Sequence, residues 1–208
     1  MPRPVNADAS ATQQRILKTA TALFAAHGLD GTSVRELAAA AGVTVATLNH
    51  YFGSKDGLFD HCVAYAYAPL QELAQSLLSL LGEAHDPRAL LARAVETTYR
   101  FGRREPVILR LLVRTALFGG GTPATGRVLL IEGVLPSVSA FLGPRLGRSP
   151  ESLHLGIQSM VFLTARYALQ PPDELAPLVG CARDDLEGIE ARVEAHLVDA
   201  AWRLLSAD

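Results

Sequence analysis

The chain has 208 residues, of which 49% are hydrophobic, and a formal net charge of -2 at pH 7. The longest stretch without a charged residue after the N-terminal part, 152–165, is shorter than the roughly 18 to 20 apolar residues that span a bilayer. Residues 1–6 contain no hydrophobic signal region. We therefore expect no membrane-spanning helix and no secretory leader, and composition favours a cytoplasmic protein with a small N-terminal module and one larger domain.

The first predicted helix follows Ser10, because Ser10 to Gln13 has the spacing of a capping box. Apolar residues then recur at three- and four-residue steps through Ile16, Ala20, Leu23 and Phe24. This pattern predicts a helix with one buried stripe.

A second capping box, Ser33 to Glu36, predicts a helix that starts near Val34. Gly42 follows where that helix must end, because glycine tolerates the left-handed conformation of many helix C-termini. Thr44 then offers an N-cap for a short helix over about residues 45–51, which is too short to be stable alone. Two helices joined by such a turn are typical of the DNA-binding helix-turn-helix.

The short helix is broken by Phe52 and Gly53, and Ser54 is placed to cap the next helix. Lys55 would then stand at the positive N-terminal end of that helix, which suits a phosphate group. We therefore expect a contact with the DNA backbone at this point.

These motifs together resemble the DNA-binding domain of the TetR family of bacterial regulators. The resemblance covers residues 12–59 and rests on many short segments in order at one spacing, none decisive alone. These are Arg15 to Leu17, Ala22 to Phe24, His27-Gly28, Gly31 to Val34, Glu36 to Ala38, Ala41 to Val43 and Leu48 to Leu58. It implies a dimer formed by the last two long helices, and a small molecule that enters the C-terminal helical core and lowers the affinity for DNA. The chain departs from many family members at Asn49, where tyrosine is more common.

The predicted DNA contacts divide into backbone contacts and base contacts. The predicted phosphate contacts are Thr32, Arg35, Thr44, His50, Tyr51 and Lys55. The predicted base contacts are Val45, Thr47 and Asn49, whereas Leu48 should face the core. Asn49 either pairs with adenine or caps local backbone, and His50 either touches the DNA backbone or only water.

Net charge gives little support to DNA binding, because the N-terminal module has no basic run. Its basic residues up to residue 62 are balanced by an equal number of acidic ones: Arg3, Arg15, Lys18, Arg35 and Lys55 against Asp8, Asp30, Glu36, Asp56 and Asp60. Helix N-termini and backbone amides bind phosphate without side-chain charge, so the interpretation does not depend on a basic patch.

The remainder of the chain is predicted to be helical, since no run of β-branched residues alternates with polar ones. A polar residue followed by proline marks a helix start at Asp86, Glu105, Thr122 and Ser149. We expect loops at 119–121 and 170–173, and kinks or breaks at Pro69 and Pro136.

The last two long helices, about 150–169 and from Leu186 onward, carry apolar stripes. Their predicted dimer-interface residues are Leu153, Ile157, Met160, Thr164, Ile189, Val193, Leu197, Ala200 and Leu204. The first of the two helices also has a second apolar stripe, which requires cover on both sides. The alternative is that both stripes belong to the chain's own core.

Polar residues set among apolar ones are candidates for an effector pocket: Tyr99, Arg114, Glu132, His154, Gln158 and Tyr167. Each of these is equally consistent with a satisfied buried group or an exposed one. The two cysteines, Cys62 and Cys181, lack metal-ligand spacing and are interpreted as buried thiols. No zinc-hydrolase pair, nucleophile elbow or complete phosphate-binding loop occurs in the sequence.

The sequence thus predicts an all-α protein, with a three-helix helix-turn-helix domain over 10–58 and a larger helical effector-binding and dimerisation domain over 59–208. The predicted function is a non-enzymatic, homodimeric repressor that a small molecule releases from a near-palindromic operator, with no cofactor, no metal and no membrane partner. The alternatives are a DNA-binding regulator without a small-molecule effector and a helical enzyme in which the motif is incidental.

Overall fold

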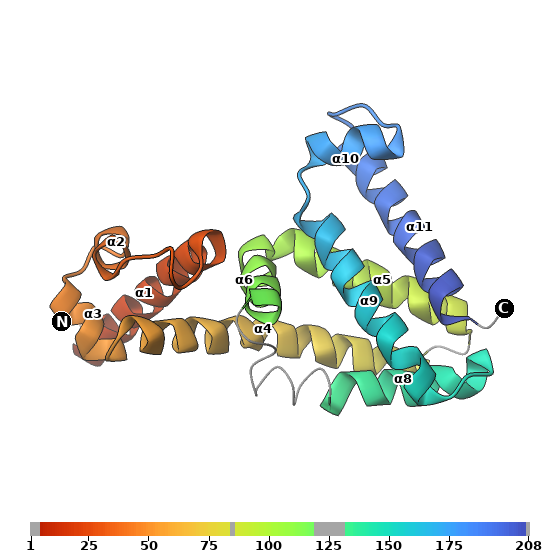
Figure 1. Ribbon diagram of the computed structural model, residues 1–208, viewed down its shortest axis with the longest axis horizontal. Coiled ribbons are helices and arrows are strands. Elements are labelled where there is room, and N and C mark those ends of the chain that lie inside the picture. The colour runs from red at the N-terminus through yellow and green to blue at the C-terminus, as the bar shows by residue number, and fades with distance from the viewer. Residues whose placement is uncertain (1–4, 84–85, 119–131, 207–208) are drawn as a thin grey trace. The chain divides into compact units, whose positions relative to one another are not determined.

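The computed structural model describes residues 5–83, 86–118 and 132–206, and those residues form ten helices and no strand. The all-α prediction is confirmed (Figure 1). The chain divides into two compact units, which are called here the first and second unit. The first unit comprises Met1–Pro69 and Val107–Thr122, and the second comprises Leu70–Pro106 and Pro123–Asp208. The sequence predicted that the N-terminal domain ends at residue 58. The first unit extends further, because it also includes part of α4 (Lys55–Glu83) and most of α6 (Pro106–Phe118).

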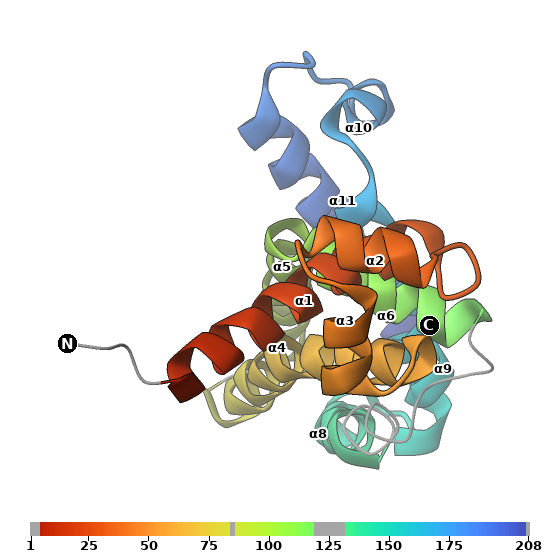
Figure 2. The same cartoon turned by 90° about the vertical axis from the view of Figure 1, so that its left-hand side faces the viewer.

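The first unit packs α1 (Val5–His27), α2 (Val34–Ala40) and α3 (Val45–Phe52) against the beginning of α4 (Figure 2). Its core includes Ile16, Phe24, Leu37, Leu48 and Leu58, none of which is more than 1% exposed. The short helices α2 and α3 are therefore held by burial of their apolar faces, as expected for helices too short to be stable alone.

The prediction that Ser10 caps the first helix was wrong. The helix begins at Val5, so Ser10 lies inside it and does not cap its N-terminus. The spacing of Ser10 and Gln13 matches a capping box, but a residue can cap a helix only where the chain before it is not helical.

Three of the predicted proline starts are confirmed. Asp86 caps α5 (Pro87–Arg104) by accepting from the amides of Arg88 and Ala89, and Ser149 caps α9 (Pro150–Leu169). Helix α6 follows Glu105 directly. The predicted start at Thr122 and the predicted loop at 119–121 lie outside the described residues.

Two other expectations about proline differ from the structure. The predicted loop at 170–173 is too long, because Pro172 opens α10 (Pro172–Val179), a helix that the sequence analysis missed. Its start is favoured by proline at the first turn and by Asp173 and Glu174 near the positive helix end. Pro136 lies in the first turn of α8 (Leu135–Leu146), where it is tolerated, whereas Pro69 lies inside α4 at the boundary between the units.

The second unit is a helical bundle in which α9 packs against α5, α8 and α11 (Leu186–Leu205). One core cluster joins Leu80 of α4, Leu90 of α5, Leu142 of α8, Leu153 of α9 and Leu205 of α11. Arg103 of α5 strengthens the bundle, because its guanidinium pairs with Glu190 at 3.1 Å and donates to the carbonyls of Ala168 and Gln170.

Candidate nucleic-acid interface and bundle cavity

The turn between α2 and α3 has the geometry of a helix-turn-helix. Ala41 is the C-cap of α2, and Gly42 follows with a φ of +64°, a conformation that strains any residue with a Cβ. The amide of Val43 donates to the carbonyl of Ala38, and Thr44 caps α3. The predicted turn and both helix starts are therefore confirmed.

The caps on either side of this turn are formed by the residues that the sequence indicated. Ser33 accepts from the Glu36 amide at 3.1 Å, and the Glu36 carboxylate accepts from the Ser33 amide at 3.4 Å. Ser54 caps α4 by accepting from the amide of Gly57 at 3.0 Å. Three helices thus begin near one another in the chain, each with amides at a positive helix end.

Helix α3 has one buried side and one exposed side. Leu48 is fully buried and Phe52 is buried, which fixes the helix on the first unit. Val45 is 37% exposed, and Asn49, one turn further on, is also exposed. Residues four apart lie on one face of a helix, so Val45 and Asn49 together form one exposed surface of α3.

Thr47 and Asn49 differ in how far their side chains are already engaged. The Thr47 hydroxyl lies 2.9 Å from that of Thr44, whose oxygen also accepts from the Thr47 amide. Within the described ranges the Asn49 side chain forms no hydrogen bond, so it does not cap local backbone there. Its amide is available as both donor and acceptor.

The predicted phosphate contacts occupy different environments. Arg35, Thr44 and His50 are exposed, and Tyr51 is half-buried with its ring edge-to-face on His50 at 5.5 Å. Thr32 is only 1% exposed, and its hydroxyl donates to the carbonyl of Gly28 at 2.7 Å. In this conformation the Thr32 hydroxyl stabilises the loop before α2 and faces away from solvent.

Lys55 has a structural contact that the sequence analysis missed. Its ammonium donates to the carbonyls of Leu29 at 2.9 Å and Thr32 at 3.3 Å, and so it joins the start of α4 to the loop between α1 and α2. An ammonium has three donors, so one remains for a phosphate oxygen.

Arg15 has a similar role on the other side of the motif. Its guanidinium donates to the carbonyl of Ala41 at 3.1 Å and thereby joins α1 to the end of α2. A helix C-terminus attracts cations because its last carbonyls lack helical partners. The sequence offered no signal for either contact, since the partners are backbone groups 26 residues away.

Both cysteines are free thiols, but the prediction that both are buried is confirmed only for Cys62. Cys62 is buried beneath α1, and burial raises the pKa of its thiol from 9.0 to about 11. Cys181 is half-buried. Among the residues that the structure describes, no cluster of histidine, cysteine and carboxylate side chains is arranged to hold a metal ion, and no helix is long and apolar enough to cross a membrane.

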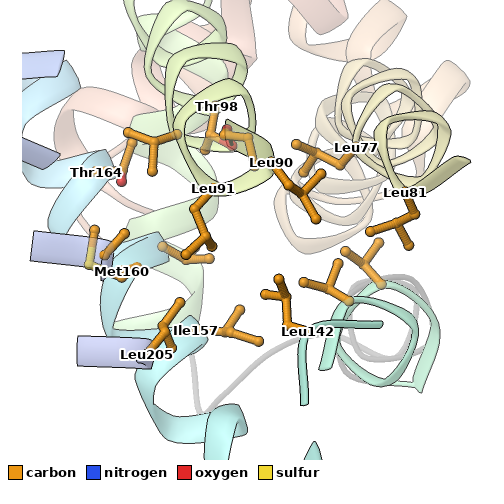
Figure 3. A pocket seen from close by; sticks show the side chains of 16 residues that line it. Leu77, Leu81, Leu90, Leu91, Thr98, Leu142, Ile157, Met160, Thr164 and Leu205 are labelled. Atoms are coloured by element: carbon orange, nitrogen blue, oxygen red, sulfur yellow. Dashed lines mark hydrogen bonds between the residues drawn. The ribbon is translucent and has the colours of Figure 1, made fainter. Parts of the chain in front are cut away.

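The second unit contains a cavity of about 120 Å³, partly open to solvent, between α4, α5, α8, α9 and α11 (Figure 3). None of the six polar residues proposed for the effector pocket lines it. Gln158 and Glu132 are exposed, and Arg114 belongs to α6 in the first unit, where its guanidinium lies against Gly28.

The other three polar residues are engaged or buried elsewhere in the second unit. His154 is 3.0 Å from the hydroxyl of Ser139, and Tyr167 lies edge-to-face on His196 at 5.6 Å. Tyr99 is fully buried, burial raises its pKa to about 12, and its hydroxyl has no partner in the described part of the chain. The structure therefore does not bring the six together.

The stripe predicted for the dimer interface lies mostly inside the chain. Its buried members are Leu153, Met160, Thr164, Ile189, Val193 and Leu197. Only Ile157, Ala200 and Leu204 retain exposed surface. Six of the nine side chains are thus already covered by their own chain.

A family model described as bacterial regulatory proteins, tetR family, matches residues 16–62, which span the helix-turn-helix. The chain carries a TetR-family DNA-binding domain. The chain is 32% identical over 120 residues to the probable HTH-type transcriptional regulator YttP of Bacillus subtilis, a match that covers 50% of this chain and 54% of YttP. It is 33% identical over 90 residues to the HTH-type transcriptional repressor KstR2 of Rhodococcus jostii, covering 43% of each. The chain thus spans about half the length of these two relatives.

Solved structures of TetR-family regulators share the fold over nearly the whole chain. A regulator from Marinobacter aquaeolei has a TM-score of 0.67 at 20% identity, with 98% of this chain and 100% of that chain covered. PfmR from Thermus thermophilus has a TM-score of 0.61 at 23% identity, with 91% and 97% covered. The TetR-family fold thus extends beyond the helix-turn-helix into the C-terminal bundle.

Proposed function

We propose that this chain is a homodimeric transcriptional repressor that reads a near-palindromic operator with α3 and leaves it when a small molecule binds the second unit. The observation that carries this proposal is the division of α3 between a buried side, with Leu48 and Phe52, and an exposed side, with Val45 and Asn49. A recognition helix needs this arrangement, because its base-reading side chains must be exposed while the helix itself is held rigidly.

The surroundings of α3 supply contacts with the DNA backbone. Arg35 is exposed on α2, and the capped start of α4 presents Lys55 and free amides. Backbone contacts of this kind fix the register of the protein on DNA, whereas base contacts select the sequence.

The proposed dimer uses the side of α9 that the bundle leaves uncovered. Leu155 is 78% exposed and Val161 is 49% exposed, and Phe162, about two turns after Leu155, is half-buried. TetR-family resemblance supports a second copy of this chain as the occupant. The six buried stripe residues then pack in the core of their own chain, hold α9 and α11 in place, and do not contact the partner.

Two relatives carry the word repressor in their names: KstR2 and the probable acrEF/envCD operon repressor of Escherichia coli, which is 27% identical over 162 residues. These names support repression as the direction of regulation. They describe those proteins, and for this chain repression is part of the proposal.

The test is to recover, from the genome that encodes the chain, the DNA fragments that the purified protein retains, and to repeat the selection with Asn49→Ala. We expect the unmodified protein to retain fragments with a shared inverted repeat, and the variant to lose the preference at one base pair in each half-site. Retention without any shared sequence would overturn the proposal.

One observation favours a regulator without a small-molecule effector. The cavity, about 120 Å³, is smaller than the roughly 300 to 1,000 Å³ of typical ligand pockets. Under this alternative the cavity is a packing defect, and no small molecule changes the affinity for the operator.

A further inference from the structure

The cavity of the second unit is lined almost entirely by hydrocarbon (Figure 3). Sixteen side chains line it, and all are apolar except Thr98 and Thr164. No charged side chain reaches it. A charged group of a ligand placed among these side chains would lose water and meet no group of opposite charge.

The two threonines lie toward the same end of the cavity. Arg103 of α5 donates to the carbonyls of Ala168 and Gln170 at the end of α9, which brings the C-terminal parts of the two helices together. Thr98 precedes Arg103, and Thr164 precedes Ala168, by about one turn. In Figure 3 they lie away from Leu142, Ile157 and Leu205. The cavity therefore has one polar end and one apolar end.

The hydroxyls of the two threonines offer complementary hydrogen bonds. Thr98 already donates to the carbonyl of Ala94 at 2.8 Å, so its oxygen is left as an acceptor. Thr164 is only 3% exposed, and its hydroxyl bonds to no group in the described part of the chain, so it is free to donate. A hydroxyl that bonds to no other group of the chain favours a ligand that supplies a partner.

We propose that this cavity binds a small, uncharged, mostly hydrocarbon molecule whose single hydroxyl or carbonyl group lies at Thr98 and Thr164. This inference rests on the proposed function only in the expectation that a molecule bound in the cavity releases the protein from DNA. An apolar cavity of about 150 Å³ binds benzene, so a space of about 120 Å³ limits the ligand to roughly one small ring or a short chain. Specificity then comes from the threonines and from the lack of any group that neutralises a charge.

Four probes of nearly equal size test the ligand class: benzyl alcohol, toluene, benzoate and benzylammonium. Their binding to the full-length protein without DNA is measured by titration calorimetry and by the rise in melting temperature. Benzyl alcohol should bind most tightly and toluene about fivefold more weakly, since one hydrogen bond is worth about 1 kcal/mol. The two charged probes should bind at least tenfold more weakly than benzyl alcohol. Equal binding of benzoate or benzylammonium, or no binding of either neutral probe, would overturn the proposal.

The variant Thr164→Val removes the free donor and keeps the volume of the side chain. It should weaken the binding of benzyl alcohol about fivefold and leave the affinity for toluene unchanged. The control is Thr97→Val, at a half-buried threonine of α5 that does not line the cavity and whose hydroxyl donates to the Arg93 carbonyl. Thr97→Val should change neither affinity, and an equal effect of the two variants would contradict the assignment of the polar end.

A filling variant, Ala94→Phe, places a ring in the cavity and should abolish binding of both neutral probes. Its control, Ala89→Phe, enlarges an exposed alanine of the same helix outside the cavity. Release of DNA is measured separately by gel shift. If benzyl alcohol binds in a Thr164-dependent way but leaves operator affinity unchanged, the ligand class stands and the ligand-released repressor is wrong.

Discussion

At the scale of single residues, Asn49 is the side chain best placed to distinguish one base pair from another. It is exposed on α3, its amide is unengaged in the described structure, and it shares a face with Val45. Asn49→Ala should cost roughly 1 to 3 kcal/mol of operator affinity and relax the preference at one base pair per half-site. Quantitative gel shifts on single-base operator variants measure this.

The control is Gln14→Ala, at an exposed position on α1. If Asn49→Ala lowers the affinity equally for all sequences, Asn49 does not read a base.

Lys55 combines a structural contact with a proposed backbone contact. Lys55→Ala removes a charged donor from the carbonyls of Leu29 and Thr32, so it should lower the free energy of unfolding by about 1 to 2 kcal/mol. It should also weaken binding to every DNA sequence alike. Urea unfolding and gel shifts measure the two effects. Lys18→Ala, at an exposed lysine of α1, is the control, and unchanged stability of Lys55→Ala would show that the two hydrogen bonds contribute nothing.

The thiol of Cys62 should resist modification because burial raises its pKa from 9.0 to about 11 and covers its sulfur. A disulfide reagent at pH 8 should therefore modify Cys181 first and Cys62 only on unfolding. Since the folded pKa is raised, the Cys62 thiol stabilises the fold below about pH 9, and this contribution is lost as the pH rises from 9 toward 11. Rapid modification of both thiols in the folded protein would contradict this.

At the scale of secondary-structure elements, the uncovered side of α9 makes a prediction about assembly. Leu155→Glu should convert dimers to monomers that remain folded, because it places a carboxylate in both halves of a two-fold interface. Leu178 on α10 is likewise exposed, at 66%, but lies outside α9, so Leu178→Glu should leave the dimer intact. Sedimentation and circular dichroism distinguish these results. Leu197→Glu is unsuitable as a test of the interface, because Leu197 is fully buried and the change should unfold the chain.

Elements defined by local signals could be predicted from the sequence, and those defined by tertiary contacts could not. Ser33, Thr44 and Ser54 cap helices through amides three residues away, so their roles are visible in a short stretch of chain. Ser10 has the same local pattern, but the helix continues through it. Helix α10 was missed because consecutive prolines also indicate a loop, and only burial of Leu175 and Ala176 distinguishes the two.

The two candidate sites differ in the same way. The residues proposed to contact DNA lie within one short motif, and most of them are exposed. The cavity is assembled from five helices, so no local pattern identifies its lining. Polar residues in apolar surroundings were a misleading signal, because side chains such as His154 and Tyr167 are engaged by neighbours outside the cavity.

At the scale of the whole molecule, the net charge of -2 predicts weak nonspecific binding to DNA. Few cations are free to face phosphate, since Arg15 and Lys55 are partly engaged by backbone carbonyls. If a dimer neutralises about four to eight phosphates, the logarithm of affinity should fall against the logarithm of salt concentration with a slope of roughly -4 to -7. A slope steeper than about -10 would mean that further cations contact the DNA.

The most direct test of the central claim, that a dimer reads DNA with two copies of α3, is a hydroxyl-radical footprint on a genomic fragment that the protein retains. Two recognition helices of a symmetric dimer enter successive major grooves about 34 to 36 Å apart. We therefore expect two protected regions on one face of the duplex, related by a two-fold axis and separated by about one helical turn or a multiple of it. A single protected region, or two without two-fold symmetry, would contradict the account.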